Sequence, residues 1–404
     1  MKLDFKFQWA TKTLDRGIFI GLVFFALCSA ISYIGARNGL YLAGTLAVVR
    51  YVINPFTLRV DRGLIGGLLI FFLVLAVESL RSLHPLPSVS KLYFNYLLPV
   101  IPFFLLAGFI KTRRQLGVII ACLLVSVLIA DADILWKGVH GDFRAQVFRY
   151  MPHFFGAMAT IIVPGLFVGA MGGAGISKGW RKVCIAMLVT TLVALAFNGS
   201  RGAWVAIGLA LLLQGGISFH HNRKHLLASL AIIFIMGLLV LFLPGVRERA
   251  ATLTDPQFIA NWQRVLVWQS CLHMIGDFPF FGIGIDSFNE IYNSRYILPE
   301  SLERQHFHAH NIFLHQLVET GIIGLTAFLY LFYQILKRSW EQAVSYHGQL
   351  PGQLFSVVFL GTVSFLFAGV VDYFFDQVIV MRLFWLLLGL AEAARNLQCD
   401  KQPI

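Results

Sequence analysis

The sequence is short of charged residues. Only 13% of its 404 residues are Asp, Glu, Lys or Arg, whereas 58% are hydrophobic. A soluble globular chain carries about 25% charged residues, so this composition excludes an ordinary soluble domain. It indicates an integral membrane protein, and the long apolar runs described below predict an all-α, polytopic fold.

Cysteine is also scarce. The five cysteines are scattered, with no CxxC spacing that would suggest a metal site. Cys271 alone falls in a large segment outside the membrane, and it has no partner there. We therefore expect no structural disulfide.

The sequence contains many long apolar runs. A membrane helix needs about 20 apolar residues, and the sequence predicts twelve spans, near 17–35, 38–53, 63–80, 92–110, 115–131, 152–172, 182–198, 202–219, 225–244, 311–336, 353–372 and 378–397. The amino end lacks a small-residue cleavage site after its apolar run, so we expect the first run to be a true span.

Lys and Arg gather in alternate loops, which predicts both termini in the cytoplasm. The net charge of +12 then reflects topology, and no basic stripe with interleaved aromatics indicates nucleic-acid binding.

One loop, residues 245–309, is out of proportion to the others. Loops of this length are usually functional or disordered. Trp262, Val265, Trp268 and Leu272 recur within it at helical spacing, which predicts an amphipathic helix near 258–275, with the tryptophans facing the membrane or the bundle. A second external loop, 132–150, is expected to pack against it. With no internal repeat and no soluble domain, residues 1–404 are interpreted as one transmembrane domain.

Three short motifs outside the membrane carry residues suited to anion binding. In "NGSRGAW", Ser200 is expected to cap a helix whose first turn attracts anions, and Arg201 adds a fork suited to phosphate. The alternative is an arginine that snorkels to lipid headgroups. Arg264 in "NWQRVLVW" is either a ligand or a solvated charge. Gly282 and Gly284 in "PFFGIGIDSF" form either an anion nest of backbone N–H groups or a simple loop.

The fourth motif, "HFHAHNIFLH", holds four histidines: His306, His308, His310 and His315. Their alternation allows a metal site, although no acidic or Cys ligand is close in sequence. They are equally compatible with polar edge residues. A third interpretation is a general base, because a neutral imidazole accepts a proton at neutral pH.

These residues resemble the signature of the O-antigen ligases, His-Asn/Ser/Gln-x9-Gly-x-x-Gly. His310 and Asn311, followed by Gly321 and Gly324, match it, and "SRGAW", "RVLVW" and "PFFGIG" occur in the order expected of the wider O-antigen ligase/polymerase-like superfamily. The predicted topology, with a large external loop before the histidine, is also similar.

The resemblance implies an inverting, metal-independent GT-C-type glycosyltransferase without a cofactor. It would transfer a polysaccharide from undecaprenyl pyrophosphate to lipid A–core at the periplasmic face of a bacterial inner membrane. His310 would be the catalytic base, with Asn311 beside it, and Arg201 and Arg264 would bind the pyrophosphate. The family's acidic residue near the last external hairpin corresponds to Asp372 or Asp376, which the sequence does not distinguish. The other three histidines have no counterpart in the signature and are expected to be interfacial.

Physical reasoning agrees, because a donor outside the cell membrane must bring its own leaving group, and two arginines with a helix start can stabilise a pyrophosphate. Two related activities use the same donor: protein O-oligosaccharyl transfer and polysaccharide polymerisation. A transporter is the non-enzyme alternative, but the spans carry little charge and no pair of broken helices.

Overall fold

The computed structural model describes residues 2–148, 152–173, 175–218, 223–253, 255, 258–302 and 305–400. These residues form helices and connecting segments, and no strand occurs among them. The helices are α1 (Lys2–Cys28), α2 (Tyr33–Ile53), α3 (Arg62–Arg81), α4 (Pro85–Lys91), the π-helical turn η1 (Leu92–Leu97), α5 (Leu98–Phe109), α6 (Arg113–Val139), α7 (Pro152–Met171), α8 (Lys178–Asn198), α9 (Arg201–Ser218), α10 (Arg223–Phe242), α11 (Pro244–Ala251), α12 (Ile259–Asp277), α13 (Phe288–Ile291), the π-helical turn η2 (Tyr292–Tyr296), α14 (Ile312–Ser345), α15 (Leu350–Ala368) and α16 (Val378–Cys399).

The predicted all-α, multi-pass membrane fold is confirmed. Within the described residues, seven helical segments are long and apolar enough to cross a membrane: Arg62–Arg81, Pro85–Phe109, Arg113–Val139, His153–Met171, Lys178–Asn198, Ile312–Ser345 and Leu350–Ala368. The other five predicted spans coincide with α1, α2, α9, α10 and α16, which do not meet the same limits of length and composition. The total of twelve spans therefore remains a prediction.

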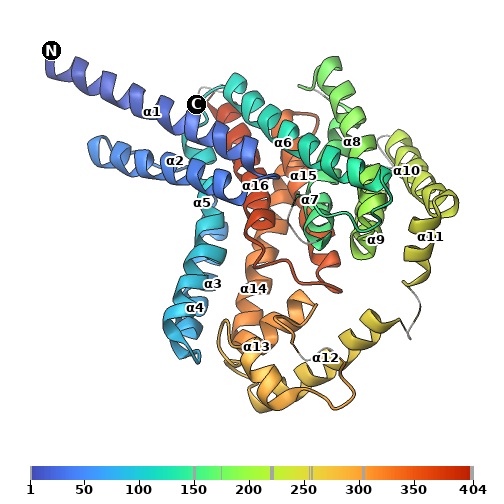
Figure 1. The fold of residues 1–404 in the computed structure, drawn as a ribbon. Helices are drawn as coiled ribbons and strands as arrows, with labels where there is room; N and C mark the ends of the chain where they lie inside the picture. Colours follow the sequence, from blue (N-terminus) through green and yellow to red (C-terminus); the bar gives the residue numbers. More distant parts are fainter. Residues whose placement is uncertain are drawn as a thin grey trace.

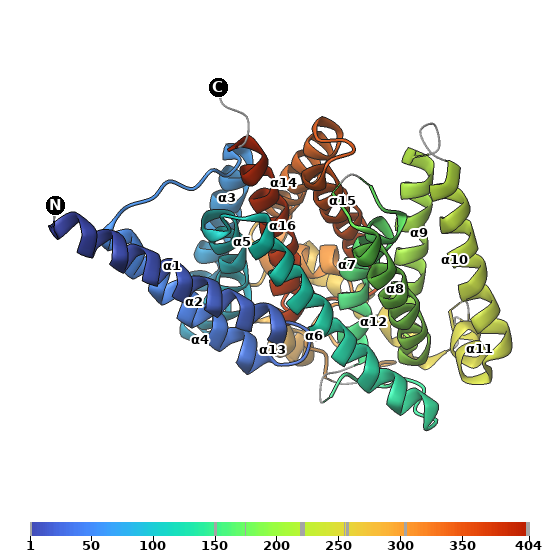
Figure 2. The same ribbon diagram turned by 90° about the horizontal axis from the view of Figure 1, so that it is seen from above.

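The middle of the bundle is built from α14, α15 and α16, which lie between the α1–α2 hairpin and the α9–α10 pair (Figure 2). Phenylalanine rings fill this centre: Phe332 stacks on Phe365 at 6.3 Å between ring centroids, and Phe384 lies 5.9 Å from both rings. Small residues allow close helix approach elsewhere. A Cβ at Gly39 of α2 would lie 2.7 Å from the Phe25 backbone nitrogen of α1. Packing of this kind fixes the helix ends that carry the site.

The described parts of the segment 245–309 lie at one end of the bundle, where α13 lies below α14 and α12 extends toward α11 (Figure 1). It has a small apolar core of its own, which includes Val267, Cys271, Met274, Phe288 and Tyr292. The helix predicted near 258–275 is confirmed as α12. The side of α12 with Trp262, Val265 and Leu272 is exposed and faces away from the bundle. Trp268 does not share this side, because its Nε1 donates a 2.9 Å hydrogen bond to the Ala309 carbonyl oxygen, so the expectation that both tryptophans face the same way was wrong. The loop after α6 meets this segment, because Phe143 contacts Gly245.

Candidate functional site

His310 occupies a constrained position just before α14. Its backbone is in the left-handed region, with φ of 51°, a conformation uncommon for residues other than glycine. Asn311 caps the helix, since its side-chain oxygen accepts a hydrogen bond of 2.9 Å from Leu314 N–H. Asn311 therefore starts the helix that supports His310, which gives a physical reason for the His-Asn pair.

The loop between α15 and α16 brings an acid to His310. Asp372 Oδ1 lies 3.5 Å from His310 Nδ1. The Ile312 N–H donates a 2.7 Å hydrogen bond to the Gly369 carbonyl oxygen, which ties the start of α14 to this loop. Burial disfavours the Asp372 carboxylate, but the hydrogen bond with His310 and the charge of His153 outweigh this effect and hold the pKa of Asp372 well below its usual value. Asp372 is thus an anion, and its carboxylate faces Nδ1 of His310.

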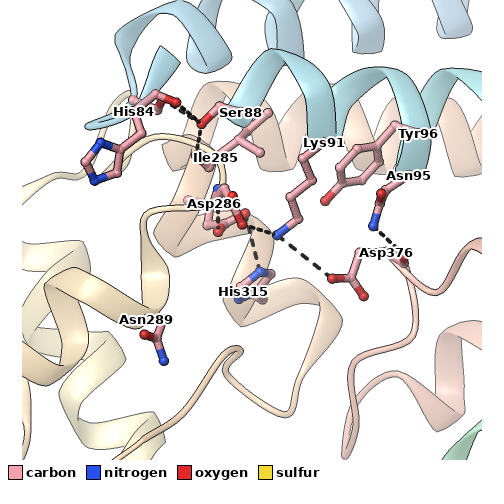
Figure 3. A network of polar contacts seen from close by, with 12 residues as sticks. His84, Ser88, Lys91, Asn95, Tyr96, Ile285, Asp286, Asn289, His315 and Asp376 are labelled. Atoms are coloured by element: carbon pink, nitrogen blue, oxygen red, sulfur yellow. Dashed lines mark hydrogen bonds and ion pairs between the residues drawn. The ribbon is translucent and has the colours of Figure 1, made fainter. Parts of the chain in front are cut away.

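Asp376, the other acidic residue considered, has a different partner. Its carboxylate lies 3.9 Å from Lys91 Nζ, and Lys91 also contacts Asp286 at 3.0 Å (Figure 3). Lys91 belongs to α4, Asp286 to the large loop and Asp376 to the last hairpin. Of the two acids, the geometry therefore sets Asp372 beside His310 and gives Asp376 to an ionic cluster. Nothing in the sequence near Lys91 indicated this cluster.

Two of the three remaining histidines, His306 and His315, are buried within the protein, so the expectation that they are interfacial was wrong. The exposed fraction of His306 is 4% and that of His315 is 0%. Both are buried because the large loop closes over them. His308 lies 4.4 Å from His310 between ring centroids, and burial together with the His310 charge lowers the pKa of His308 well below its usual value. Among the described residues, no group of three or more His, Cys, Asp or Glu side chains is arranged to hold a metal ion.

Arg201, the first residue of α9, is buried rather than snorkelling, with 7% of its surface exposed. Its guanidinium donates to the Thr252 carbonyl oxygen, to Thr252 Oγ1 at 2.6 Å and to Asn261 Oδ1 at 3.2 Å. The Phe258 ring lies 5.2 Å from the same guanidinium. All three partners are uncharged residues of the large loop, so they orient the arginine without neutralising it.

Three further arginines lie near Arg201. Arg249 of α11 donates to the Gly199 carbonyl oxygen at 3.2 Å. Burial, followed by the charges of Arg201, Arg144 and Arg264, lowers the pKa of Arg249 to about 10. None of the four forms an ion pair with a carboxylate in the part of the chain that the structure describes. A cavity of about 260 Å³, lined in part by Arg144, Gly199 and Arg249, opens beside them. Repulsion among these charges favours an anion as their ligand.

Motifs in the sequence predict a role for Arg201 and Arg264 but not for Arg144 and Arg249. Arg144 lies within the second external loop, 132–150, and Arg249 lies in "RERA"; neither has a recognisable motif around it. No local sequence pattern marks these two arginines, because the four charges lie close together only when the segments at α6, α9, α11 and α12 pack together.

Arg264 belongs to α12, whose Asn261 accepts a hydrogen bond from Arg201 and whose Trp268 donates one to the Ala309 carbonyl oxygen. The helix that carries Arg264 therefore connects the arginine cluster with the segment just before His310.

The anion-nest interpretation of Gly282 and Gly284 is wrong. Gly282 N–H donates to the Phe278 carbonyl oxygen at 3.2 Å, and Gly284 N–H donates to that of Glu319 at 2.9 Å. These amides are therefore engaged within the protein. Both glycines have positive φ, and a Cβ at Gly282 would lie 2.5 Å from the Val318 carbonyl oxygen. They are required because the loop backbone lies directly on α14.

The two glycines of the His-Asn-x9-Gly-x-x-Gly pattern have the matching role on α14. Gly321 has φ of 63° and ψ of −169°, which kinks the helix. The kink frees Ile322 N–H to donate to the Pro279 carbonyl oxygen at 2.9 Å. A Cβ at Gly321 would overlap the Phe280 carbonyl oxygen, and one at Gly324 would overlap the Thr320 side chain. "PFFGIG" and the Gly-x-x-Gly pair thus form one packing unit, which docks the large loop on α14 beside His310.

The fold and the site together define a multi-pass, all-α membrane protein with a histidine–carboxylate pair and an arginine cluster at one end of its bundle. Residues 186–329 of the chain match the O-antigen ligase family. This match confirms the resemblance to the O-antigen ligase superfamily, and it covers Arg201, Arg264, His310 and both glycines of the signature. Among curated proteins, none matches the chain.

Proposed function

We propose that the protein is an inverting glycosyltransferase that transfers O-antigen polysaccharide from undecaprenyl pyrophosphate to a sugar hydroxyl of lipid A–core. The reaction would take place at the periplasmic face of a bacterial inner membrane, in a GT-C-type enzyme. Family membership supports a glycosyltransferase-like enzyme with a lipid-linked polysaccharide substrate. The donor, the acceptor and the residue roles are our inference from the site.

One observation carries the proposal: α12, the helix that contains Arg264, contacts Arg201 through Asn261 and the peptide before His310 through Trp268. A lipid pyrophosphate bound by Arg201 and Arg264 would then lie next to the imidazole of His310. Such proximity is what transfer requires, since the acceptor hydroxyl and the leaving group must flank the same anomeric carbon.

The chemistry needs one base and one anion site. The acceptor oxygen forms a bond to the anomeric carbon while the bond from that carbon to the pyrophosphate oxygen breaks. The hydroxyl proton passes to His310, and undecaprenyl pyrophosphate leaves as an anion. Because Asp372 faces Nδ1, the lone pair of Nε2 is the one available to take the proton. Attack opposite to the leaving group inverts the anomeric configuration.

The arginines supply the positive charge that the leaving pyrophosphate needs, with planar donors matched to phosphate oxygens. We therefore expect transfer without a divalent cation. Exhaustive chelation of the purified protein should leave turnover with a lipid-linked donor unchanged. Activity that is lost on chelation and restored by zinc would instead favour the metal interpretation of His306, His308 and His310.

The function is tested by the lipopolysaccharide ladder of a null strain. Loss of long chains with accumulation of lipid-linked polymer is the expected result, and the wild-type gene should restore the ladder. His310→Ala should fail to restore it, whereas the matched control His273→Ala, at an exposed position of α12, should succeed. An unchanged ladder with loss of a glycoprotein would indicate protein O-oligosaccharyl transfer, and short chains confined to single repeats would indicate a polymerase.

A further inference from the structure

We infer that His315 is a positioning residue that holds the peptide before His310, in a clamp completed by Glu319 and Trp268. The inference deepens the proposed function, on which its kinetic consequences rest. His315 occupies one of the nine unspecified positions of the signature that singles out His310, and it has no route to the acceptor because it is fully buried.

The clamp acts on both ends of the residue that precedes His310. Ala309 N–H donates to His315 Nδ1 at 3.4 Å, and the Ala309 carbonyl oxygen accepts a hydrogen bond of 2.9 Å from Trp268 Nε1. Ala309 is itself fully buried. Its orientation is therefore set by two side chains that approach from different elements, α14 and α12.

This arrangement fixes the tautomer of His315. Because Nδ1 accepts from the Ala309 N–H, the ring proton of a neutral imidazole must be on Nε2. Nε2 lies 3.3 Å from Glu319 Oε2, one helical turn along α14. The other oxygen, Glu319 Oε1, accepts from Asp286 N–H at 3.0 Å. Glu319 therefore holds the ring in the orientation that presents Nδ1 to Ala309.

Glu319 is connected to the ionic cluster around Lys91 through Asp286, whose N–H donates to Glu319 Oε1. Lys91 pairs with the carboxylates of Asp286 and Asp376 (Figure 3). The side chain of Lys91 is 16% exposed. Through this cluster the orientation of His315 depends on α4, the large loop and the last hairpin together.

His310 needs such a clamp because its backbone conformation is unfavourable. A residue other than glycine at positive φ is strained and persists only where the surroundings over-determine its conformation. The contacts of Ala309 fix the backbone on the amino-terminal side of His310. The 2.7 Å hydrogen bond from Ile312 N–H to the Gly369 carbonyl oxygen fixes the backbone on its carboxy-terminal side. Without the His315 contact, His310 can relax away from Asp372.

Two substitutions of His315 separate the two contacts. In His315→Asn, the amide oxygen takes the place of Nδ1 and still accepts from Ala309. In His315→Gln, the amide nitrogen takes the place of Nε2 beside Glu319, but the acceptor for Ala309 is lost. We expect His315→Asn to keep kcat within about threefold and His315→Gln to lower it about 10- to 100-fold, which corresponds to about 1.5–3 kcal/mol. KM for the lipid-linked donor should be unchanged in both.

A second readout does not depend on turnover: the rate at which diethyl pyrocarbonate modifies His310, resolved from His306 and His308 by tandem mass spectrometry. His315→Asn should match the wild type, and His315→Gln should differ. If His310→Ala retains turnover, the proposed base is wrong, yet this modification rate still tests the clamp. If His315→Gln does not fold, Trp268→Phe removes the opposite half of the clamp and should also lower kcat and change the rate. Equal behaviour of the Asn and Gln variants, or a Trp268→Phe protein identical to wild type, would overturn the inference.

Discussion

Asp372 Oδ1 lies 3.5 Å from Nδ1 of His310, although α14 and α15 separate the two residues along the chain. The hydrogen bond from Ile312 N–H to the Gly369 carbonyl oxygen joins the same two segments. The pair is therefore built by backbone contacts close to both side chains, and Asp372 faces Nδ1 of the imidazole that we propose as the base.

The first prediction compares the two acids of the last hairpin. Asp372→Asn should lower kcat about 10- to 100-fold, because a neutral amide stabilises the protonated imidazole less than a carboxylate does. His310→Ala should lower it about 10²- to 10⁴-fold, the usual contribution of a general base. Asp376→Asn should act mainly on the thermal unfolding midpoint, since Asp376 contacts Lys91. Turnover of the purified variants decides this, and a larger loss of kcat in Asp376→Asn than in Asp372→Asn would reverse the assignment.

Much of this architecture could be predicted from the sequence, because apolar runs and loop length are one-dimensional signals. The helix ranges and α12 followed from them. The buried side of α12 did not, since the helix is apolar on two sides and only contact with Phe288 and Tyr292 selects one. The choice between Asp372 and Asp376 required the path of the last hairpin.

The glycines show the same limit. The conformational freedom of Gly282 alone suggests one half of an anion nest. Its role is instead determined by the kinked backbone of α14 near Gly321, on which the loop packs. Nothing in the spacing of the two motifs indicates that they are in contact. The Arg144 and Arg249 charges were missed for the same reason.

The second prediction concerns the docking of the large loop. Gly321→Ala places a Cβ at positive φ and against the Phe280 carbonyl oxygen. Left-handed strain costs of order 1–3 kcal/mol, and the steric overlap adds to it, so both the unfolding midpoint and kcat should fall. Gly117→Ala is the matched control, because it lies in α6 with nothing within 4 Å of the added Cβ. Thermal unfolding in detergent, followed with turnover, measures both. Equal stability of the two variants would contradict the docking role of Gly321.

The third prediction is a pH dependence of stability that arises from His308. Its pKa in the folded protein is lowered, first by burial and then by the neighbouring His310 charge. The unfolded chain binds a proton below about pH 6.5 and the folded one does not. The contribution of His308 is therefore fully present above that pH and is lost as the pH falls, by up to about 1.4 kcal/mol per pH unit.

His308→Gln should remove this component. The unfolding midpoint of the wild type should fall between pH 7 and pH 5 more than that of the variant. His273→Gln, at an exposed position of α12, should behave like the wild type. If His308→Gln loses as much stability over this range as the wild type, His308 is not the group that titrates.

The fourth prediction is that Arg201 and Arg264 act on the same pyrophosphate from different segments. Arg201 begins α9, whereas Arg264 belongs to α12 in the large loop. Loss of a charge-assisted hydrogen bond costs about 1.5–3 kcal/mol, so each Ala substitution should weaken donor binding or turnover about 10- to 100-fold. Lys should restore only part of the loss, because a point charge does not reproduce the bidentate fork. Arg295→Ala, at an exposed arginine of the same loop, should have little effect.

A double-mutant cycle at matched expression measures the coupling between Arg201 and Arg264. The double substitution should cost less than the sum of the two single losses, because one substitution already breaks the site. Strictly additive losses, or normal donor binding by Arg264→Ala, would show that the two side chains do not share one phosphate site.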